Sequence, residues 1–417
     1  MKKLAVIVTE FPKSTETFIY RDLVAFLDAG VEVRVYHLTP YRKAQALHGF
    51  AAPLKERVAE IGFVQPGAVL RALLRRPGAL GRAVGRILWA FRAEPKFALK
   101  SLALVPKALA IGEDARIWGA GHVHAEFALH PATAAWLARR MGGVPYSVSC
   151  RAHDIFRTQA LLAQKLGEAA AVRTVSDFGR TFLRERVAGM ANREIHVIHS
   201  SVGVGGIAPV EDIPSTAPFE ILYVGALEPK KGVDHLLDAL VLAQERLGDW
   251  RCTLIGHGPD AERLRARASD LGLGKRVTFA GMQPFERVAA AYRSASVCVA
   301  PSVIGPSGRQ EGIPNVMIEA LAYQRPAITT NISGIPELIR DGETGLLVPP
   351  GDAQALAEAL CRVRDDPAAA LAMARRGRTH VEREFDLAVN ARRQLDLFFP
   401  SGEGERRGAI PELLAAN

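Results

Sequence analysis

Two glutamates eight positions apart, Glu311 and Glu319, enclose the stretch GIPN, and the second lies among apolar residues in the run VMIEALA. An ionised carboxylate in a dry interior needs a partner, because removing the partner of a buried charge costs of order 3–5 kcal/mol. Gly312 permits a close approach of the backbone, and Pro314 suits the first turn of a helix. A helix beginning at Pro314 places Glu319 about one and a half turns further on.

Glycine-rich turns follow three strand-like runs in the second half of the chain. YVGALEPKKGVDHLL places Gly225 at a strand end, with Lys230 and Lys231 before a helix, and LIGHGPDAERL places Gly256 and Gly258 similarly. EGIPNVMIEA is the third. Helix N-termini present unsatisfied N–H groups and about half a positive charge, which favours phosphate. Together the three turns predict a diphosphate site, although a single Gly-x-Gly is more often only a tight turn.

A bound nucleotide would supply a partner for Glu319. A carboxylate near the start of a helix can accept hydrogen bonds from a ribose diol, as the acidic residue of dinucleotide-binding folds does. The alternative for Glu319 is a buried ion pair with an arginine elsewhere in the domain. For Glu311 the alternative is a favourable charge ahead of a helix.

The composition is that of a globular protein, since 417 residues with 48% hydrophobic content are enough for two sizeable cores. The scattered cysteines include no Cys-x-x-Cys pair, and no histidines cluster at ligand spacing, so we expect a reduced cytosol and no metal. The start, MKKLAVIV, has too short an apolar run for a signal peptide and is interpreted as a buried strand. No run reaches the roughly 18–20 apolar residues of a membrane span.

Most of the net charge of +9 lies in one segment, residues 68–107, which holds nine basic residues and one acidic residue. This concentration argues against a nucleic-acid partner. The segment also carries leucines, a tryptophan and phenylalanines, and three prolines divide it into short helices. Basic amphipathic helices lie on anionic membranes. A solvated face of ordinary helices explains the pattern equally well.

Strand-like runs alternate with helical patterns along the chain, which predicts an α/β fold with two doubly wound, Rossmann-like domains. We expect an N-terminal domain over residues 1–203, a linker over 204–217 and a second domain over 218–385. Residues 386–417 would form a helix that returns to the first domain, followed by a polar tail. Ligands bind outside the carboxyl ends of such strands, so we expect the domains to face each other across a cleft.

The chain resembles the retaining glycosyltransferases of family 4, which have the two-Rossmann B-type fold. The resemblance rests on EGIPNVMIEALAYQRPAITTNISGIPELIRDGETGLLVPPGD, and on YVGALEPKKGVDHLLDAL and LIGHGPDAERLRARASDLGLGKRVTFAGMQP before it. It is strong over residues 219–365 and looser before them. There, EFPKSTETFI, HVHAEFA and RAHDIF are similar to the subgroup that builds exopolysaccharides such as colanic acid.

Carried over to this sequence, the resemblance assigns Glu311 to hydroxyls of the donor sugar, Glu319 to the ribose and Lys231 to the leaving diphosphate. The residues whose backbone N–H groups would face the diphosphate and sugar are Gly312, Ile313, Pro314 and Asn315. No cofactor is implied, because the nucleotide sugar is a co-substrate. No metal is implied, because helix N-termini and Lys231 would do the work of a divalent ion on the leaving diphosphate.

In the first half, the resemblance places His153 near the anomeric carbon, although a core histidine is the alternative. The loop after the first strand would face donor phosphate or acceptor; it consists of Ser14, Thr15, Glu16 and Thr17.

Two departures concern the site. Ala226 stands where the family usually has an arginine that contacts the diphosphate, for which Lys230 or Arg309 are candidate substitutes. Glu126 stands where a histidine is common in the subgroup.

We therefore expect a cytoplasmic, metal-independent hexosyltransferase, associated with the inner face of the plasma membrane if residues 68–107 bind lipid. Its partners would be a UDP- or GDP-sugar and a saccharide or lipid-linked acceptor. The alternatives are a nucleotide-sugar 2-epimerase of similar fold and a non-catalytic membrane-associated scaffold.

Overall fold

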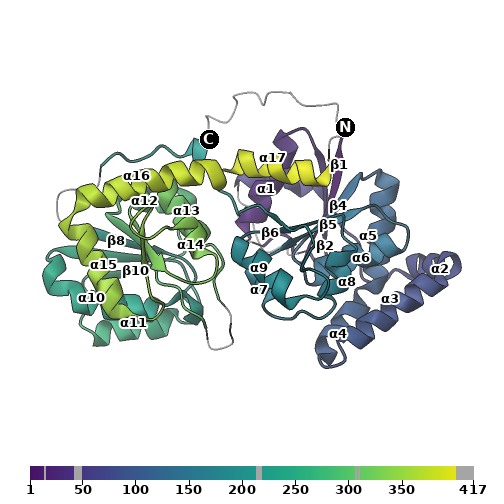
Figure 1. The fold of residues 1–417 in the computed structure, drawn as a ribbon, viewed down its shortest axis with the longest axis horizontal. Coiled ribbons are helices and arrows are strands. Elements are labelled where there is room, and N and C mark those ends of the chain that lie inside the picture. Colours follow the sequence, from purple (N-terminus) through teal and green to yellow (C-terminus); the bar gives the residue numbers. More distant parts are fainter. Residues whose placement is uncertain (14–15, 42–48, 213–217, 306–307, 309, 401–417) are drawn as a thin grey trace. The chain divides into compact units, whose positions relative to one another are not determined.

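The computed structural model describes residues 1–13, 16–41, 49–212, 218–305, 308 and 310–400, without the side chains of residues 152 and 153. The chain forms two compact units. Of the described residues, unit 1 contains Met1–His199 and residues 387–400, and unit 2 contains Ser200–Asp386 (Figure 1). Each unit has one parallel sheet, so the predicted α/β class with two doubly wound domains is confirmed. The cleft expected between the domains stays a prediction.

Unit 1 has a seven-stranded sheet in the order β3-β2-β1-β4-β5-β6-β7. Its strands are β1 (Lys3–Val8), β2 (Glu32–His37), β3 (Val58–Ala59), β4 (His122–Glu126), β5 (Tyr146–Cys150), β6 (Ala171–Thr174) and β7 (His196–Val197). Its helices are α1 (Thr17–Asp28), α2 (Pro66–Arg75), α3 (Pro77–Ala90), α4 (Pro95–Ala103), α5 (Val105–Trp118), α6 (His130–Arg140), α7 (Ala152–Ile155), α8 (Leu162–Gly167), α9 (Asp177–Arg186) and α17 (Leu387–Phe398).

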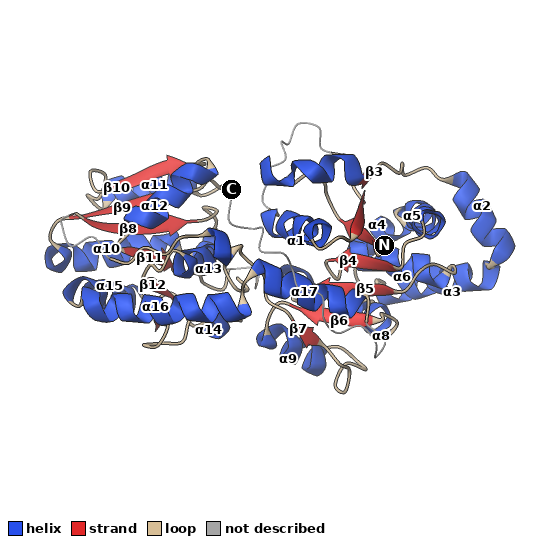
Figure 2. Cartoon of the chain, turned by 90° about the horizontal axis from the view of Figure 1, so that it is seen from above, coloured by secondary structure: helices blue, strands red, loops and turns tan. Residues whose placement is uncertain are grey.

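The interior strand β1 shows why this sheet has helices on both faces (Figure 2). Its sequence, KLAVIV, is buried along nearly its whole length, as expected of a parallel strand covered on both sides. Successive side chains point to opposite faces. Ala5 and Ile7 therefore join the core under α5 and α6, while Leu4, Val6 and Val8 join the core under α1 and α17.

A buried network of charged and polar side chains connects α17 with β6 and α1 in unit 1. Arg173 of β6, whose side chain is 1% exposed, lies 3.6 Å from the Asp22 carboxylate of α1. The Gln394 amide of α17 donates to the same carboxylate over 3.2 Å, and the Arg173 guanidinium donates to Gln394. Burial raises the pKa of Asp22, and the positive charge of Arg173 opposes that rise.

Unit 2 has a six-stranded sheet in the order β10-β9-β8-β11-β12-β13. Its strands are β8 (Phe219–Val224), β9 (Trp250–Ile255), β10 (Val277–Gly281), β11 (Val297–Ala300), β12 (Ala327–Thr330) and β13 (Leu346–Val348). Its helices are α10 (Val233–Leu247), α11 (Ala261–Asp270), α12 (Phe285–Ser294), α13 (Asn315–Ala322), α14 (Ile335–Leu338), α15 (Ala353–Asp365) and α16 (Pro367–Glu384).

The strand order of unit 2 reverses direction between β8 and β11, which makes that position a topological switch point. One core contains residues of α10, α11 and α15, and the other contains residues of α12, α13 and α14. The loops after β8 and β11 must diverge there, because their helices cover opposite faces of the sheet. Ligands of open α/β sheets bind at such positions.

The described part of the predicted linker, residues 204–217, packs on unit 2. The Val202 amide donates to the Phe385 carbonyl over 3.0 Å, just before the linker begins. Further on, the Arg325 guanidinium donates to the Val210 carbonyl over 2.8 Å. The two units divide between His199 and Ser200, and the predicted bounds of the linker stay a prediction.

The segment 66–103 forms a helical arm, which consists of α2, α3 and α4 and extends from the sheet of unit 1 (Figure 1). The prolines at the starts of these helices divide the arm as the sequence predicted. The arm buries few side chains. Its exposed large apolar residues are Leu70, Leu73, Leu74, Leu88, Trp89 and Leu99. Among the described residues, no helix is both long and apolar enough to span a membrane.

The buried charge network predicts the effect of replacing Arg173. In Arg173→Met the Asp22 carboxylate loses its cation in the interior, so the free energy of unfolding should fall by about 3–5 kcal/mol. The matched change Arg180→Met removes an exposed partner of Asp177 and should cost less than about 1 kcal/mol. Urea denaturation of the full chain measures both, and equal effects of the two substitutions would contradict the assignment.

Candidate functional site

Two lysines and a glutamate meet at the switch point of unit 2. The Lys231 Nζ atom lies 2.8 Å from Glu311 Oε2, and the Lys230 Nζ atom lies 3.4 Å from the same oxygen. Lys230 also lies 3.5 Å from the Glu228 carboxylate. The side chains of Lys231 and Glu311 are both 16% exposed, so this ion-paired cluster is largely, but not fully, removed from water.

The pKa of Glu311 shows which effect dominates in the cluster. Burial by itself would raise the pKa of this carboxyl, but Lys231 and Lys230 outweigh burial and lower it below the ordinary value of 4.5. Glu311 is therefore ionised at neutral pH, and it neutralises only one of the two lysines. Glu228 supplies the second carboxylate beside Lys230, so two lysines and two glutamates meet where the loops after β8 and β11 approach each other.

Gly232 allows these two loops to approach each other. It follows the 3₁₀ turn Pro229–Lys231, has φ +66°, and is the capping residue immediately before α10. A Cβ atom on Gly232 would lie 1.9 Å from the carbonyl oxygen of Pro301, the residue after β11. Only glycine fits, since the obstacle is backbone that cannot turn away. The close contact holds Lys231 within reach of Glu311.

The turn after β9 packs equally closely against the turn after β8. A Cβ atom on Gly256 would lie 1.9 Å from the Gly225 carbonyl oxygen, and one on Gly258 would lie 2.2 Å from the Leu227 carbonyl oxygen. The amides of Gly225 and Gly256 donate to backbone carbonyls over 2.9 Å. Backbone packing thus explains these glycines. Diphosphate contacts of Gly225, Gly256 and Gly258 stay predictions. The amides of Gly225 and Gly256 would have to leave their present carbonyl acceptors in order to donate to a diphosphate.

The helix after the glutamate motif, α13, begins one residue later than expected, with Pro314 in the capping position and Asn315 as its first residue. The first N–H groups of a helix have no acceptor within it. Ile313 and Pro314 are buried, whereas Gly312 and Asn315 are partly exposed. In the segment between Glu311 and α13, Ile313 and Pro314 therefore pack into the interior while Gly312 and Asn315 stay accessible. The binding role of this segment stays a prediction.

Glu319 is half-buried, at one edge of the apolar helix rather than in its core. The Tyr292 hydroxyl of α12 lies 3.0 Å from the Val316 carbonyl and 3.3 Å from Glu319 Oε2, so these two acceptors share its one proton. The Tyr292 ring stacks on Tyr323 at a centroid distance of 5.2 Å. A tyrosine hydroxyl from the neighbouring helix is thus one partner of this carboxylate. The ribose contact stays a prediction.

In unit 1 the predicted loop residues Ser14 and Thr15 lie outside the described residues, and Glu16 and Thr17 stand at the start of α1. Glu16 Oε1 accepts from Lys13 Nζ over 2.7 Å. Burial raises the pKa of Glu16, and Lys13 opposes the rise. These residues follow β1, which borders the switch point between β1 and β4.

His153 lies in α7, directly after β5, and its side chain is outside the described part of the chain. Its role stays a prediction, as does the suggestion that Arg309, also outside the described residues, substitutes at Ala226. In the parts of the chain that the structure describes, no group of three or more His, Cys, Asp or Glu side chains is arranged to hold a metal ion.

Sequence reasoning missed Arg151. Its Nε atom donates to Glu126 Oε1 over 2.5 Å, and its guanidinium lies 4.0 Å from the ring centroid of Phe18. Burial would raise the pKa of Glu126, but Arg151 and His124 hold it well below the ordinary range. Glu126 therefore carries a charge at the end of β4, where the subgroup often has histidine. The signal for Arg151 was its place two residues before His153 in CRAHDIF.

Comparisons with known proteins agree with this geometry. Residues 218–366, which contain the ion-paired cluster, match the family described as glycosyl transferases group 1. The putative colanic acid biosynthesis glycosyltransferase WcaL of Escherichia coli (strain K12) is 29% identical over 400 residues, covering 93% of this chain and 97% of WcaL. The amylovoran biosynthesis glycosyltransferase AmsK of Erwinia amylovora is 26% identical over 423 residues, covering 94% and 98%.

Among solved structures, Anabaena Alr3699/HepE in complex with UDP aligns with a TM-score of 0.69 and 16% identity, over 95% of this chain and 99% of that one. This likeness concerns the fold, which is that of two-domain glycosyltransferases. Residues 218–366 thus form a glycosyl transferases group 1 domain, and along nearly its whole length the chain is similar to glycosyltransferases of exopolysaccharide biosynthesis.

Proposed function

We propose that this glycosyltransferase moves a hexosyl unit from a UDP- or GDP-sugar to a hydroxyl of a saccharide or lipid-linked saccharide, with retention at the anomeric carbon, in the synthesis of a cell-surface polysaccharide. The ion-paired cluster of Lys230, Lys231 and Glu311 carries the proposal. The names of WcaL and AmsK support the polysaccharide class, and HepE with UDP supports a nucleoside diphosphate donor.

The donor diphosphate would compete with Glu311 for the lysines. Both groups are anionic, but the diphosphate carries more charge and accepts from Lys231 and Lys230 together. Its arrival would release the Glu311 carboxylate to accept hydrogen bonds from the hydroxyls of the sugar. Glu319 would take the ribose in the same complex, exchanging its hydrogen bond from Tyr292 for the diol.

We propose that Lys230 substitutes for the arginine that is usual at Ala226. It reaches the same Glu311 oxygen as Lys231, so two cations converge there even without the usual arginine. Preorganised cations that meet the charge developing on the leaving group are a major source of catalysis. We propose that the lysines, with the N-terminus of α13, replace a divalent ion on the leaving diphosphate, and that no cofactor is required.

We further propose that the enzyme acts on the cytoplasmic side at an anionic membrane surface, where a lipid-linked acceptor would be found. The helical arm supports this, because Leu74 and Trp89 are 75% and 66% exposed beside a concentration of arginines. Apolar side chains flanked by cations are typical of helices that lie in the headgroup region.

The cluster makes a prediction that separates a binding role from a structural one. Glu311→Gln removes the carboxylate paired with Lys231 and leaves Lys230 with Glu228 alone, so the free energy of unfolding should fall by about 1–3 kcal/mol. Adding Lys231→Met should recover part of that loss, and a double-mutant cycle from urea denaturation measures the coupling. Transfer should be lost in both variants, because the diphosphate and sugar contacts are absent.

Glu228→Gln is the control, since Glu228 contacts Lys230 but has no assigned role at the sugar. It should change transfer little. Recovery of both stability and transfer in the double variant would reduce Glu311 to a structural counter-ion.

The lowered pKa of Glu311 sets a pH dependence. A carboxyl whose pKa is lower in the folded than in the unfolded protein stabilises the fold above the unfolded value and loses that contribution as pH falls. The difference in unfolding free energy between the wild type and Glu311→Gln should therefore be full at neutral pH and shrink below about 4.5. Denaturation at several pH values measures it, and a difference that grows on acidification would contradict the ion pairing.

Transfer should continue in excess EDTA, because the lysines and α13 supply the positive charge. A nucleotide-sugar panel with a membrane-lipid acceptor fraction, with products resolved from the donor, measures this. Complete loss that magnesium restores would overturn the metal-free proposal. Conversion of the donor without an acceptor would instead identify a nucleotide-sugar epimerase.

Vesicle binding should rise with the content of anionic lipid and fall with salt, since each cation near a charged surface contributes about 1 kcal/mol and salt screens it. Leu74→Ser with Trp89→Ser should weaken binding without changing the charge. Absent or salt-insensitive binding would refute the membrane proposal and leave the transfer reaction untouched.

A further inference from the structure

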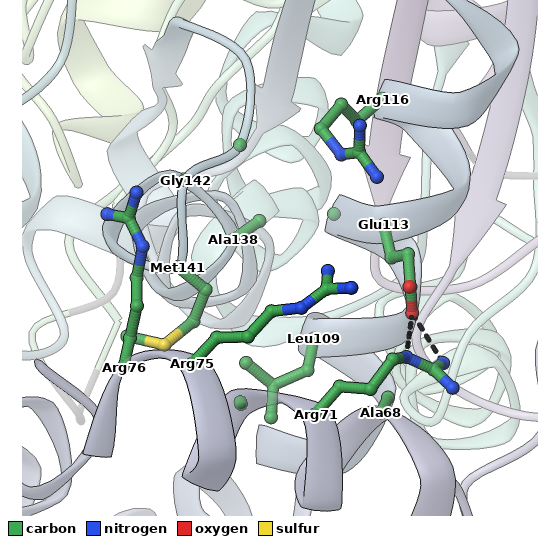
Figure 3. Close-up of a pocket in the computed structure, with 13 residues that line it drawn as sticks. Ala68, Arg71, Arg75, Arg76, Leu109, Glu113, Arg116, Ala138, Met141 and Gly142 are labelled. Atoms are coloured by element: carbon green, nitrogen blue, oxygen red, sulfur yellow. Dashed lines mark hydrogen bonds and ion pairs between the residues drawn. The ribbon is translucent and has the colours of Figure 1, made fainter.

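A cavity of about 70 Å³ lies in unit 1 between α2, α5 and α6 (Figure 3). Four arginines line it: Arg71, Arg75, Arg76 and Arg116. A single acidic residue, Glu113, shares the lining. None of the residues that line the cavity is one that we assigned to the donor. The cavity opens at the surface, because its arginines are exposed.

The charges around this cavity are unbalanced. Arg71 is engaged, because its Nε atom donates to Glu113 Oε2 over 3.0 Å and its second guanidinium nitrogen over 2.5 Å. Within the described residues, the side chains of Arg75, Arg76 and Arg116 make no hydrogen bond or ion pair. Three cations that surround one cavity without a counter-charge repel one another, and an anion between them would relieve that repulsion.

Close helix packing forms the wall opposite α2. A Cβ atom on Gly112 of α5 would lie 2.6 Å from the Ala138 Cβ atom of α6, so only glycine permits this approach. At the end of α6, Gly142 has φ +89°, and a Cβ atom there would lie 3.1 Å from an Arg76 guanidinium nitrogen. Gly112 thus lets α5 and α6 pack closely, and Gly142 leaves room for the Arg76 guanidinium.

The chemistry of the lining selects the ligand. A guanidinium presents paired donors that match phosphate oxygens, and a lysine does not. Apolar side chains border the same arginines: Leu74 is three residues from Arg71, and Leu70 is four residues from Leu74, spacings that share a helix face. A ligand that carries a phosphate next to acyl chains matches both features.

We propose that this cavity binds the phosphate of an anionic phospholipid headgroup, while the leucines of α2 enter the surrounding membrane. The inference rests on the membrane part of the proposed function and adds a specific headgroup site to it. A diffuse basic surface responds only to surface charge, whereas a guanidinium-lined cavity distinguishes phosphate from other anions.

The test compares two kinds of vesicle of equal surface charge. Both use a neutral glycolipid, which contains no phosphate, mixed either with phosphatidylglycerol or with oleate. The full chain should bind the phosphatidylglycerol vesicles on the order of tenfold more tightly, the value of a single strong charge-assisted hydrogen bond. Arg75→Lys with Arg116→Lys keeps every charge but removes the guanidinium geometry, so this variant should bind both vesicles alike.

Arg82→Lys with Arg86→Lys is the control, because these arginines belong to α3 of the same arm but do not line the cavity. It should keep the preference for phosphatidylglycerol. Equal binding of the wild type to the two vesicles would overturn the headgroup site. Inorganic phosphate that releases the chain at concentrations comparable to the lipid phosphate would identify a free-anion site and overturn the lipid assignment. None of these binding experiments measures turnover, so a negative result does not bear on sugar transfer.

Discussion

The turns after β8, β9 and β11 lie closer together than side chains would allow, and the site in unit 2 depends on that approach. Gly232 faces the Pro301 carbonyl and Gly256 faces the Gly225 carbonyl at distances that exclude a Cβ atom. The parallel sheet places these turns at one edge, and the reversal between β8 and β11 directs their helices to opposite faces. Lysines after one strand can then meet a carboxylate after the other.

The sequence predicted the features that depend on local pattern. Runs such as KLAVIV predicted buried parallel strands, and the glycine turns predicted a site at strand ends. It could not predict pairings between distant residues. Glu311 is 80 positions from Lys231, and Gln394 is still further from Asp22, so only the folded chain shows that these side chains meet. Arg151 was missed for the same reason, since its partner Glu126 belongs to another strand.

The arm of α2, α3 and α4 answers part of a question that the sequence left open. Its charge and apolar content were equally consistent with a solvated face and with a membrane surface. The structure shows that several leucines and Trp89 are exposed rather than packed on the sheet, and that arginines gather around a cavity next to them. Burial of an amphipathic helix depends on what packs against it, which periodicity alone does not reveal.

The central claim is that the lysines after β8 hold a nucleoside diphosphate, and calorimetry of nucleotide binding tests it most directly. UDP or GDP should bind the wild type more tightly than the matching nucleoside, and Lys231→Met should weaken diphosphate binding by roughly tenfold or more, since a charged hydrogen bond contributes about 1.5–3 kcal/mol. Binding of the nucleoside itself should not change. A nucleoside that binds the wild type as tightly as its diphosphate would contradict the account.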